Sequence, residues 1–158
     1  LMFFGPFVSE RFVSVGEFLE KHPNAGLPVV RELILGSKSN TAVDAYRAAH
    51  LVAETRSNLS DFWTKYDALM VPTVGTVVTL KEALSDPLTP SFNNGYYTNF
   101  ANPLGLASIS VPYGTTSDGV PYGVTFLAPA REERKLTSIA QNFLSAVSLQ
   151  GKANTLSQ

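Results

Sequence analysis

The stretch YYTNFANPLGLASISVPYGTTSDGVPYGVTFLAP, residues 96–129, decides the fold of this chain. It contains two apolar runs, residues 107–111 and 122–127. The segment between them is rich in Gly, Thr, Ser and Asp, and prolines follow both runs. Apolar runs of this length bounded by turn residues are typical of buried strands. The stretch therefore predicts two buried strands joined by a surface loop.

The order of residues in this stretch resembles the amidase-signature hydrolases. In that family a segment with Thr and Asn precedes a strand ending in Ser-x-Pro, and a second strand begins with Pro-x-Gly-Val. The corresponding residues here are Thr98, Asn99, Asn102, Pro103, Ser110, Pro112, Pro121, Gly123 and Val124. The resemblance implies an α/β fold of the amidase-signature type, a mixed β-sheet covered by helices in an α/β/α arrangement. Only the C-terminal part of that fold is expected in this chain.

A second segment, GPFVSER at residues 5–11, resembles a Gly-Pro-aromatic-Val-x-Glu-Arg segment of the allophanate hydrolases, one branch of this family. The resemblance implies that Arg11 binds the carboxylate of the substrate. In that branch a tyrosine eight residues earlier helps to hold the substrate. Phe3 occupies this position and keeps the ring without the phenolic hydroxyl. Arg11 and Phe3 are therefore the expected substrate-binding residues, and Phe3 leaves the exact substrate open.

The chemistry of Arg11 is consistent with this role. A guanidinium group presents a planar fork of donors that matches a carboxylate bidentately. Allophanate carries a carboxylate beside its scissile urea-type nitrogen, so binding at that end positions the other. The alternative is that Arg11 opens a helix and pairs with Glu10 or another acid on a solvated face.

The composition indicates one soluble domain. Lys and Arg number 12 and Asp and Glu number 13, which gives no indication of nucleic acid or an anionic membrane as a partner. The absence of cysteine excludes disulfides, thiolate zinc sites and a cysteine nucleophile. No apolar run reaches the length of a membrane span, and residues 1–8 lack the features of a signal peptide. We expect a cytoplasmic protein, truncated from a longer one because it begins with Leu1 inside the second motif.

Helical spacing of apolar residues predicts three helices in the first part of the chain. The first covers residues 9–21, and the second covers residues 28–36 with Gly36 as a left-handed cap. A third and longest helix is expected over residues 41–63, begun by a capping box of Thr41 and Asp44. Its predicted buried stripe consists of Ala45, Ala49, Val52, Leu59, Phe62 and Trp63.

The second part of the chain predicts a strand, an irregular segment and a final helix around the two signature strands. Residues 67–71 are expected to form a short buried strand, and residues 75–94 mainly irregular structure with a helical turn at 80–84. The final helix has an apolar stripe of Leu136, Ile139, Ala140, Phe143, Leu144 and Val147. Residues 1–149 are predicted to be the C-terminal half of an amidase domain, and residues 150–158 a disordered polar tail.

The catalytic residues of the family are not found in this chain. Amidase-signature enzymes use two serines and a lysine, with the nucleophile in a Gly/Ser-rich loop, and no such loop occurs here. Ser37 beside Lys38 is the arrangement most similar to a serine nucleophile and a lysine base. A polar loop between two helices explains these two residues better than a catalytic role does. His22 and His50 have no partners at metal-ligand spacing, and the glycines form no phosphate-binding pattern. We therefore expect no catalytic residue, metal or cofactor in this chain.

These observations predict part of an amidohydrolase that cleaves a C–N amide bond, with allophanate as the leading substrate. The products are ammonia and carbon dioxide, in urea nitrogen catabolism. The expected partners are a small amide or carboxylated urea substrate, the missing N-terminal half of the amidase domain and a second copy in a homodimer. The alternatives are a general amidase, a biuret-pathway hydrolase, or a non-catalytic interaction module.

Overall fold

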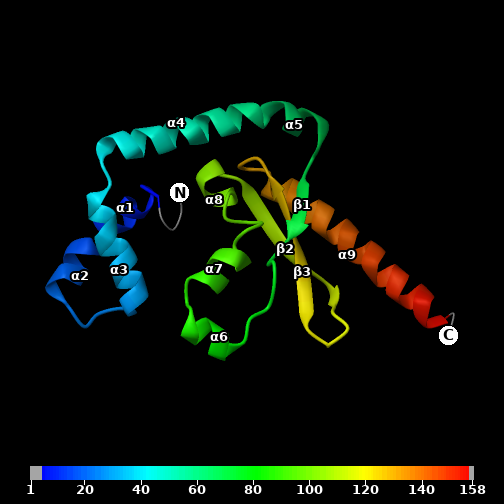
Figure 1. Ribbon diagram of the computed structural model, residues 1–158. Helices are drawn as coiled ribbons and strands as arrows, with labels where there is room; N and C mark the ends of the chain where they lie inside the picture. The colour runs from blue at the N-terminus through cyan, green and yellow to red at the C-terminus, as the bar shows by residue number, and fades with distance from the viewer. Residues whose placement is uncertain (1–4, 157–158) are drawn as a thin grey trace. The chain divides into compact units, whose positions relative to one another are not determined.

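The computed structural model describes the backbone of residues 5–156 and the side chains of residues 5–148. The chain divides into two compact units, Leu1–Asn58 and Leu59–Gln158, where the sequence predicted one domain without a linker. Each unit is described by itself below and can be followed in Figure 1. In the described part of the chain, no helix combines the length and the apolar character that crossing a membrane requires.

The first unit begins with an uninterrupted helical run. Helix α1 (Val8–Arg11) passes into a π-helical turn η1 (Phe12–Gly16) and then into α2 (Glu17–Lys21). The helix predicted over residues 9–21 is therefore confirmed. Its π-helical middle was not predicted, because apolar spacing does not distinguish one wide turn from regular α-helix.

Helix α3 (Pro28–Gly36) has the predicted bounds, with Pro28 in its first turn. The left-handed cap predicted at Gly36 is wrong, since Gly36 has φ −62° and ψ −28°. The chain continues instead into a 3₁₀ turn, η2 (Ser37–Ser39), and the Ser37 N–H donates to carbonyls in the last turn of the helix.

Helix α4 (Ala42–Asn58) begins at the predicted capping box. The Thr41 N–H donates to Asp44 Oδ2 over 2.9 Å, and the Asp44 N–H donates to Thr41 Oγ1 over 3.2 Å. The helix ends at Asn58, so the single helix predicted to residue 63 is wrong, and so is its rank as the longest. Its buried residues are Ala48 and Val52, whereas Ala45 and Ala49 of the predicted stripe are exposed.

The second unit begins with α5 (Ser60–Lys65) and β1 (Leu69–Pro72). The strand predicted at residues 67–71 is therefore present, but its predicted burial is wrong, since its residues are half-buried or exposed and Met70 is 54% exposed. Two short helices follow, α6 (Leu80–Ser85) and α7 (Thr89–Asn94). The helical turn predicted near residue 80 is confirmed, with a capping box between Thr79 and Glu82. Helix α7 was not predicted, since its sequence TPSFNN is rich in residues that favour turns.

Helix α8 (Ala101–Leu104) precedes the two signature strands, β2 (Ala107–Thr115) and β3 (Pro121–Ala128). Both strands were predicted, and both are longer than the apolar runs that indicated them. The sheet order is β1-β3-β2, and both pairings are antiparallel. The central strand β3 therefore joins two strands that are far apart in sequence.

The last helix, α9 (Glu133–Leu156), packs on one face of this sheet. The core between them contains Ala107, Val111, Phe126, Ala128, Leu136 and Ala140. Leu136 is 1% exposed and Ala140 2%, whereas Leu144 of the predicted stripe is 37% exposed. Figure 1 shows the final turns of α9 extending past the sheet, and its helical backbone continues through residues 150–156 of the predicted tail.

Candidate functional site

The predicted carboxylate-binding residue, Arg11, is the last residue of α1. A turn at Gly5 and Pro6 precedes this helix, since the Val8 N–H donates to the Gly5 carbonyl over 3.1 Å and the Ser9 N–H to the Pro6 carbonyl over 3.0 Å. Val8 is buried and Arg11 is half-buried. Phe3, the other predicted substrate-binding residue, lies outside the described residues.

The π-helical turn follows Arg11 directly. A Cβ at Gly16 would lie 2.5–2.7 Å from three ring atoms of Phe12, so glycine is needed where the ring folds back over the helix. π-Helical turns are rare and are frequent at functional sites. The sequence carried no signal for this turn beyond Gly16 itself.

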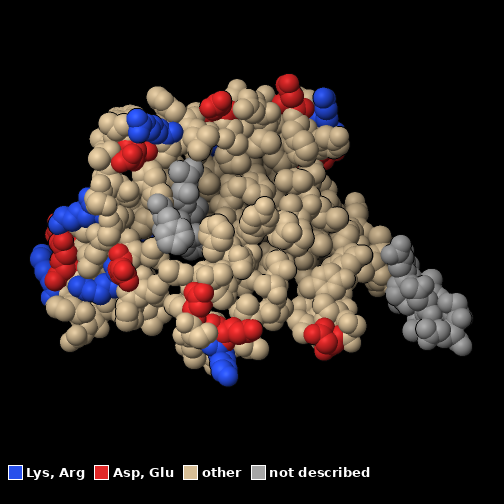
Figure 2. All heavy atoms as spheres, viewed as in Figure 1, with Lys and Arg blue, Asp and Glu red and all other residues tan. Residues whose placement is uncertain are grey.

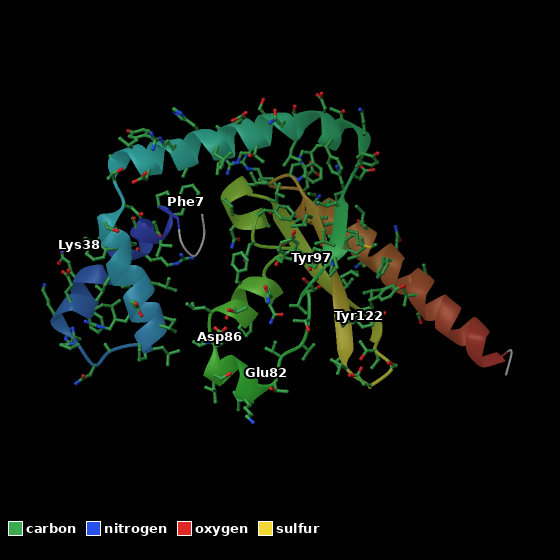
Figure 3. The ribbon with its side chains drawn as sticks, viewed as in Figure 1. Phe7, Lys38, Glu82, Asp86, Tyr97 and Tyr122 are labelled. Carbon is green, nitrogen blue, oxygen red and sulfur yellow. The ribbon has the colours of Figure 1, made fainter. Side chains whose placement is uncertain are left out.

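The serine and lysine after α3 do not form a nucleophile and base. The Ser37 hydroxyl is buried and donates to the Ile34 carbonyl over 2.6 Å. The Lys38 ammonium lies 2.8 Å from the Glu20 carboxylate of α2. Lys38 is labelled in Figure 3. Both side chains therefore make local contacts.

The two histidines differ in their surroundings. The His22 ring stacks on Phe18 with centroids 4.2 Å apart, and its Nδ1 lies 2.8 Å from the Phe18 carbonyl. His50 is exposed on α4. Across residues 5–148, no group of three His, Cys, Asp or Glu side chains is placed to hold a metal ion.

In the second unit, two strands and the residue that follows a third strand contribute three hydroxyls that form a chain across the sheet. Thr125 on β3 is 3% exposed, and its Oγ1 lies 2.7 Å from Ser110 Oγ on β2. On its other side it lies 2.9 Å from Oγ1 of Thr73, which follows β1. Three hydroxyls share two hydrogen bonds, so one proton at an end of the chain can be donated outward. Ser110 was a predicted landmark, whereas Thr73 and Thr125 were missed.

The landmark Gly123 lies beside this chain. A Cβ at Gly123 would be 2.7 Å from the Val111 carbonyl and 3.3 Å from Thr73 Oγ1. The Thr73 N–H donates to the Gly123 carbonyl over 3.1 Å. Glycine is therefore required where the chain leaving β1 approaches β3 and β2.

An open groove with a volume of about 570 Å³ lies between the segment after β1 and the tip of the β2–β3 hairpin. Its lining consists of Val74, Gly75, Thr76, Val77, Thr115, Thr116, Asp118, Val120 and Tyr122. The Thr116 hydroxyl donates to Asp118 and lowers the pKa of that carboxyl. The lining offers hydroxyls and one carboxylate, and it contains no serine, lysine or histidine. Figure 3 labels Tyr122 at this end of β3.

The predicted landmarks before β2 lie in a turn. The Thr98 and Asn99 N–H groups both donate to the Gly95 carbonyl, over 3.0 and 2.7 Å. Asn102 lies in α8, and its carbonyl accepts from Gly105, which has a left-handed φ of 66°. These contacts are all made by the backbone, so the role of the two asparagine side chains stays a prediction.

Charges of both signs are interspersed on the face of the molecule shown in Figure 2. The net charge is −1.

Comparison with known proteins gives relatives for most of the chain. The urea amidolyase of Saccharomyces cerevisiae is 28% identical over 145 residues, which are 90% of this chain and 8% of that protein. The structure of selenomethionine-substituted allophanate hydrolase from Kluyveromyces lactis has a TM-score of 0.82 at 28% identity, over 91% of this chain and 24% of that one. A structure described as an amidase has a TM-score of 0.64 at 23% identity, which shows a shared fold over 88% of this chain and 33% of that one.

These proteins are much longer than this chain, which spans 8% of the urea amidolyase and 24% of the allophanate hydrolase. The fold is therefore part of the amidase-signature fold, as the sequence predicted. The amidase family model matches residues 12–137, which include the π-helical turn, the hydroxyl chain and both signature strands. The match begins one residue after Arg11. This chain belongs to the amidase family.

Proposed function

We propose that this chain is part of an amidohydrolase that hydrolyses allophanate to ammonia and carbon dioxide. The observation that carries the proposal is the likeness to the Kluyveromyces lactis allophanate hydrolase, with a TM-score of 0.82 over 91% of the chain. The similarity to urea amidolyase agrees with it. In this proposal Arg11 binds the carboxylate of the substrate through its guanidinium group.

The nucleophile and its base come from another part of the amidase domain in this proposal. Among the described residues, Ser37 and Lys38 are occupied in local contacts. The sheet offers two edges for the rest of the domain, because β1 and β2 each pair only with β3 in the described part of the chain. Unpaired edges present free N–H and C=O groups to a further strand.

The proposal is tested in the full-length protein by comparing allophanate with propionamide, a neutral amide. Arg11→Ala removes a charge-assisted, bidentate contact worth about 1.5–3 kcal/mol, so kcat/KM for allophanate should fall about tenfold to a hundredfold. Arg11→Lys keeps the charge without the fork and should lose less. The value for propionamide should stay unchanged in both variants.

A general amidase is the second candidate. The amidase family model matches residues 12–137 and thus supports amide hydrolysis without reference to Arg11. Equal turnover of propionamide and allophanate, insensitive to Arg11→Ala, would establish this candidate in place of the first.

The division of catalysis has a separate test. The purified 158-residue polypeptide should release no ammonia from allophanate. Turnover by this polypeptide that is lost in Ser37→Ala would overturn the proposed division. If the full-length protein turns over no amide, the hypothesis of a non-catalytic interaction module replaces that of an enzyme.

A further inference from the structure

We propose that the turn of residues 37–40 positions Arg11, and that Ser9 and Asn40 are positioning residues for substrate binding. This inference rests on the proposed function, because it assumes that Arg11 binds the carboxylate. Residues 37–40 are called the 37–40 turn below. They contact α1 and η1 at Ser9 and Phe12, the residues that lie two before and one after Arg11.

The contact before Arg11 is a pair of hydrogen bonds at one hydroxyl. Ser9 Oγ donates to the Ser37 carbonyl over 3.0 Å and accepts from Asn40 Nδ2 over 3.0 Å. Since the single hydroxyl proton is directed to the carbonyl, the second bond must be donated by the asparagine amide. Both bonds are partly buried and join residues 28 and 31 positions apart in sequence. They attach α1 to the end of α3.

The contact after Arg11 is made through an aromatic ring. The Lys38 ammonium lies 5.3 Å from the centroid of the Phe12 ring, within the range of a cation–π interaction. The opposite charge for Lys38 is Glu20, at 2.8 Å. On its own helical run the Phe12 ring lies over Gly16, where an added Cβ would be 2.5–2.7 Å from the ring. The ring therefore lies between the helix and the 37–40 turn.

These contacts act on the backbone that carries Arg11. Ser9 and Phe12 are three residues apart and lie on the same face of a helix, whereas Arg11 falls about 200° around the axis from Ser9. The run of α1, η1 and α2 is a short helical segment, and the stability of such a segment comes mainly from tertiary packing. Helix α1 contacts both α3 and η2, and these tertiary contacts set the direction of Arg11. Bidentate binding of a carboxylate requires the direction of the Arg11 side chain to be tightly fixed.

The test compares Ser9→Ala and Asn40→Ala with Ser39→Ala in the full-length protein. Ser39 is the matched control, because its exposed hydroxyl belongs to the same turn and donates only to the Gly36 carbonyl, over 2.9 Å. We expect Ser9→Ala and Asn40→Ala each to raise KM for allophanate about fivefold, with kcat within about twofold. Ser39→Ala should leave both parameters unchanged, and Ser9→Thr, which keeps the hydroxyl, should restore KM. KM for propionamide should not move in any of these variants.

A double-mutant cycle separates positioning from general structure. If Ser9 acts through Arg11, Ser9→Ala should add no further increase in KM to Arg11→Ala. A multiplicative increase, or an equal increase for propionamide, overturns the inference. If Ser9→Ala does not fold, as judged by circular dichroism, Asn40→Ala is used in the cycle instead.

The outcomes distinguish this inference from the proposed function. If Arg11→Ala leaves KM for allophanate unchanged, the proposed role of Arg11 fails and the positioning role fails with it. If Arg11→Ala raises KM while Ser9→Ala and Asn40→Ala do not, the proposed function stands and only the positioning role is overturned.

Discussion

At the residue scale, Gly123 is a position where the addition of a single methyl group should destabilise the fold. A Cβ there would be 2.7 Å from the Val111 carbonyl, a backbone atom that cannot rotate away. We predict that Gly123→Ala lowers the free energy of unfolding by about 1–3 kcal/mol, as expected for overpacking. Urea denaturation of the purified protein measures this change.

Gly36→Ala is the control for this prediction. Gly36 has a helical φ of −62°, and a Cβ there would meet nothing within 4 Å. This substitution should raise the free energy of unfolding by about 0.4–1 kcal/mol, because alanine restricts the unfolded chain. Equal effects at the two glycines would contradict the close approach described for Gly123.

The buried hydroxyl of Thr125 gives a second prediction at this scale. Thr125→Val keeps the shape of the side chain and removes the middle of the chain from Ser110 to Thr73. Two hydroxyls then lose a partner, so the free energy of unfolding should fall by about 1–3 kcal/mol. Thr137→Val is the matched control, since Thr137 Oγ1 is exposed and donates to the Glu133 carbonyl of its own helix. A change as large at Thr137 would refute the importance of the cross-strand bonds.

At the scale of elements, α4 depends on its N-terminal capping box for a defined start. The hydroxyl of Thr41, and then its backbone N–H, hold the pKa of Asp44 below its ordinary value of 3.8. Because the folded pKa lies below the unfolded one, the ionised carboxylate contributes stability that is fully present above pH 3.8. This contribution is lost as the pH falls through the folded pKa.

We predict that Thr41→Ala raises the pKa of Asp44 toward 3.8, because it removes the larger of the two hydrogen-bond contributions. Thr41→Ser keeps a hydroxyl and should preserve the low pKa. An NMR titration of the Asp44 carboxyl carbon measures both. An unchanged pKa in Thr41→Ala would show that the capping box is not formed in solution.

At the scale of the whole molecule, the two units should differ in stability. The second unit has a sheet whose central strand β3 is paired on both sides and packed against α9 by a buried core. The first unit consists of helices, and its buried hydrophobic residues are Val8, Leu19, Ile34, Ala48 and Val52. Units with separate cores can open separately.

We therefore predict two groups of amides in native-state hydrogen exchange. Amides of β3 should exchange slowest and share one opening free energy, and amides of α3 should have a lower one. The measurement is made on the purified protein over a series of low urea concentrations. A single opening free energy for all protected amides would show that the chain unfolds as one unit.

The sequence by itself determined the local elements and the family. Helix α3, strand β1 and both signature strands follow from apolar spacing bounded by Pro, Gly and Thr, since these patterns act over a few neighbouring residues. The landmarks around Ser110 and Gly123 indicated an amidase-signature hydrolase, and the family match confirmed it.

Tertiary structure alone decided the contacts that join distant residues. The Thr73–Thr125 bond spans 52 positions, and the contacts of Ser9 with the 37–40 turn span 28 and 31. Neither has a local pattern, because a hydroxyl can bond to any donor or acceptor that the fold brings within reach. Tertiary structure also decided that α4 buries Ala48 and not Ala45. Which face of a helix is buried depends on its surroundings, and a weakly apolar helix such as α4 does not specify that face by itself.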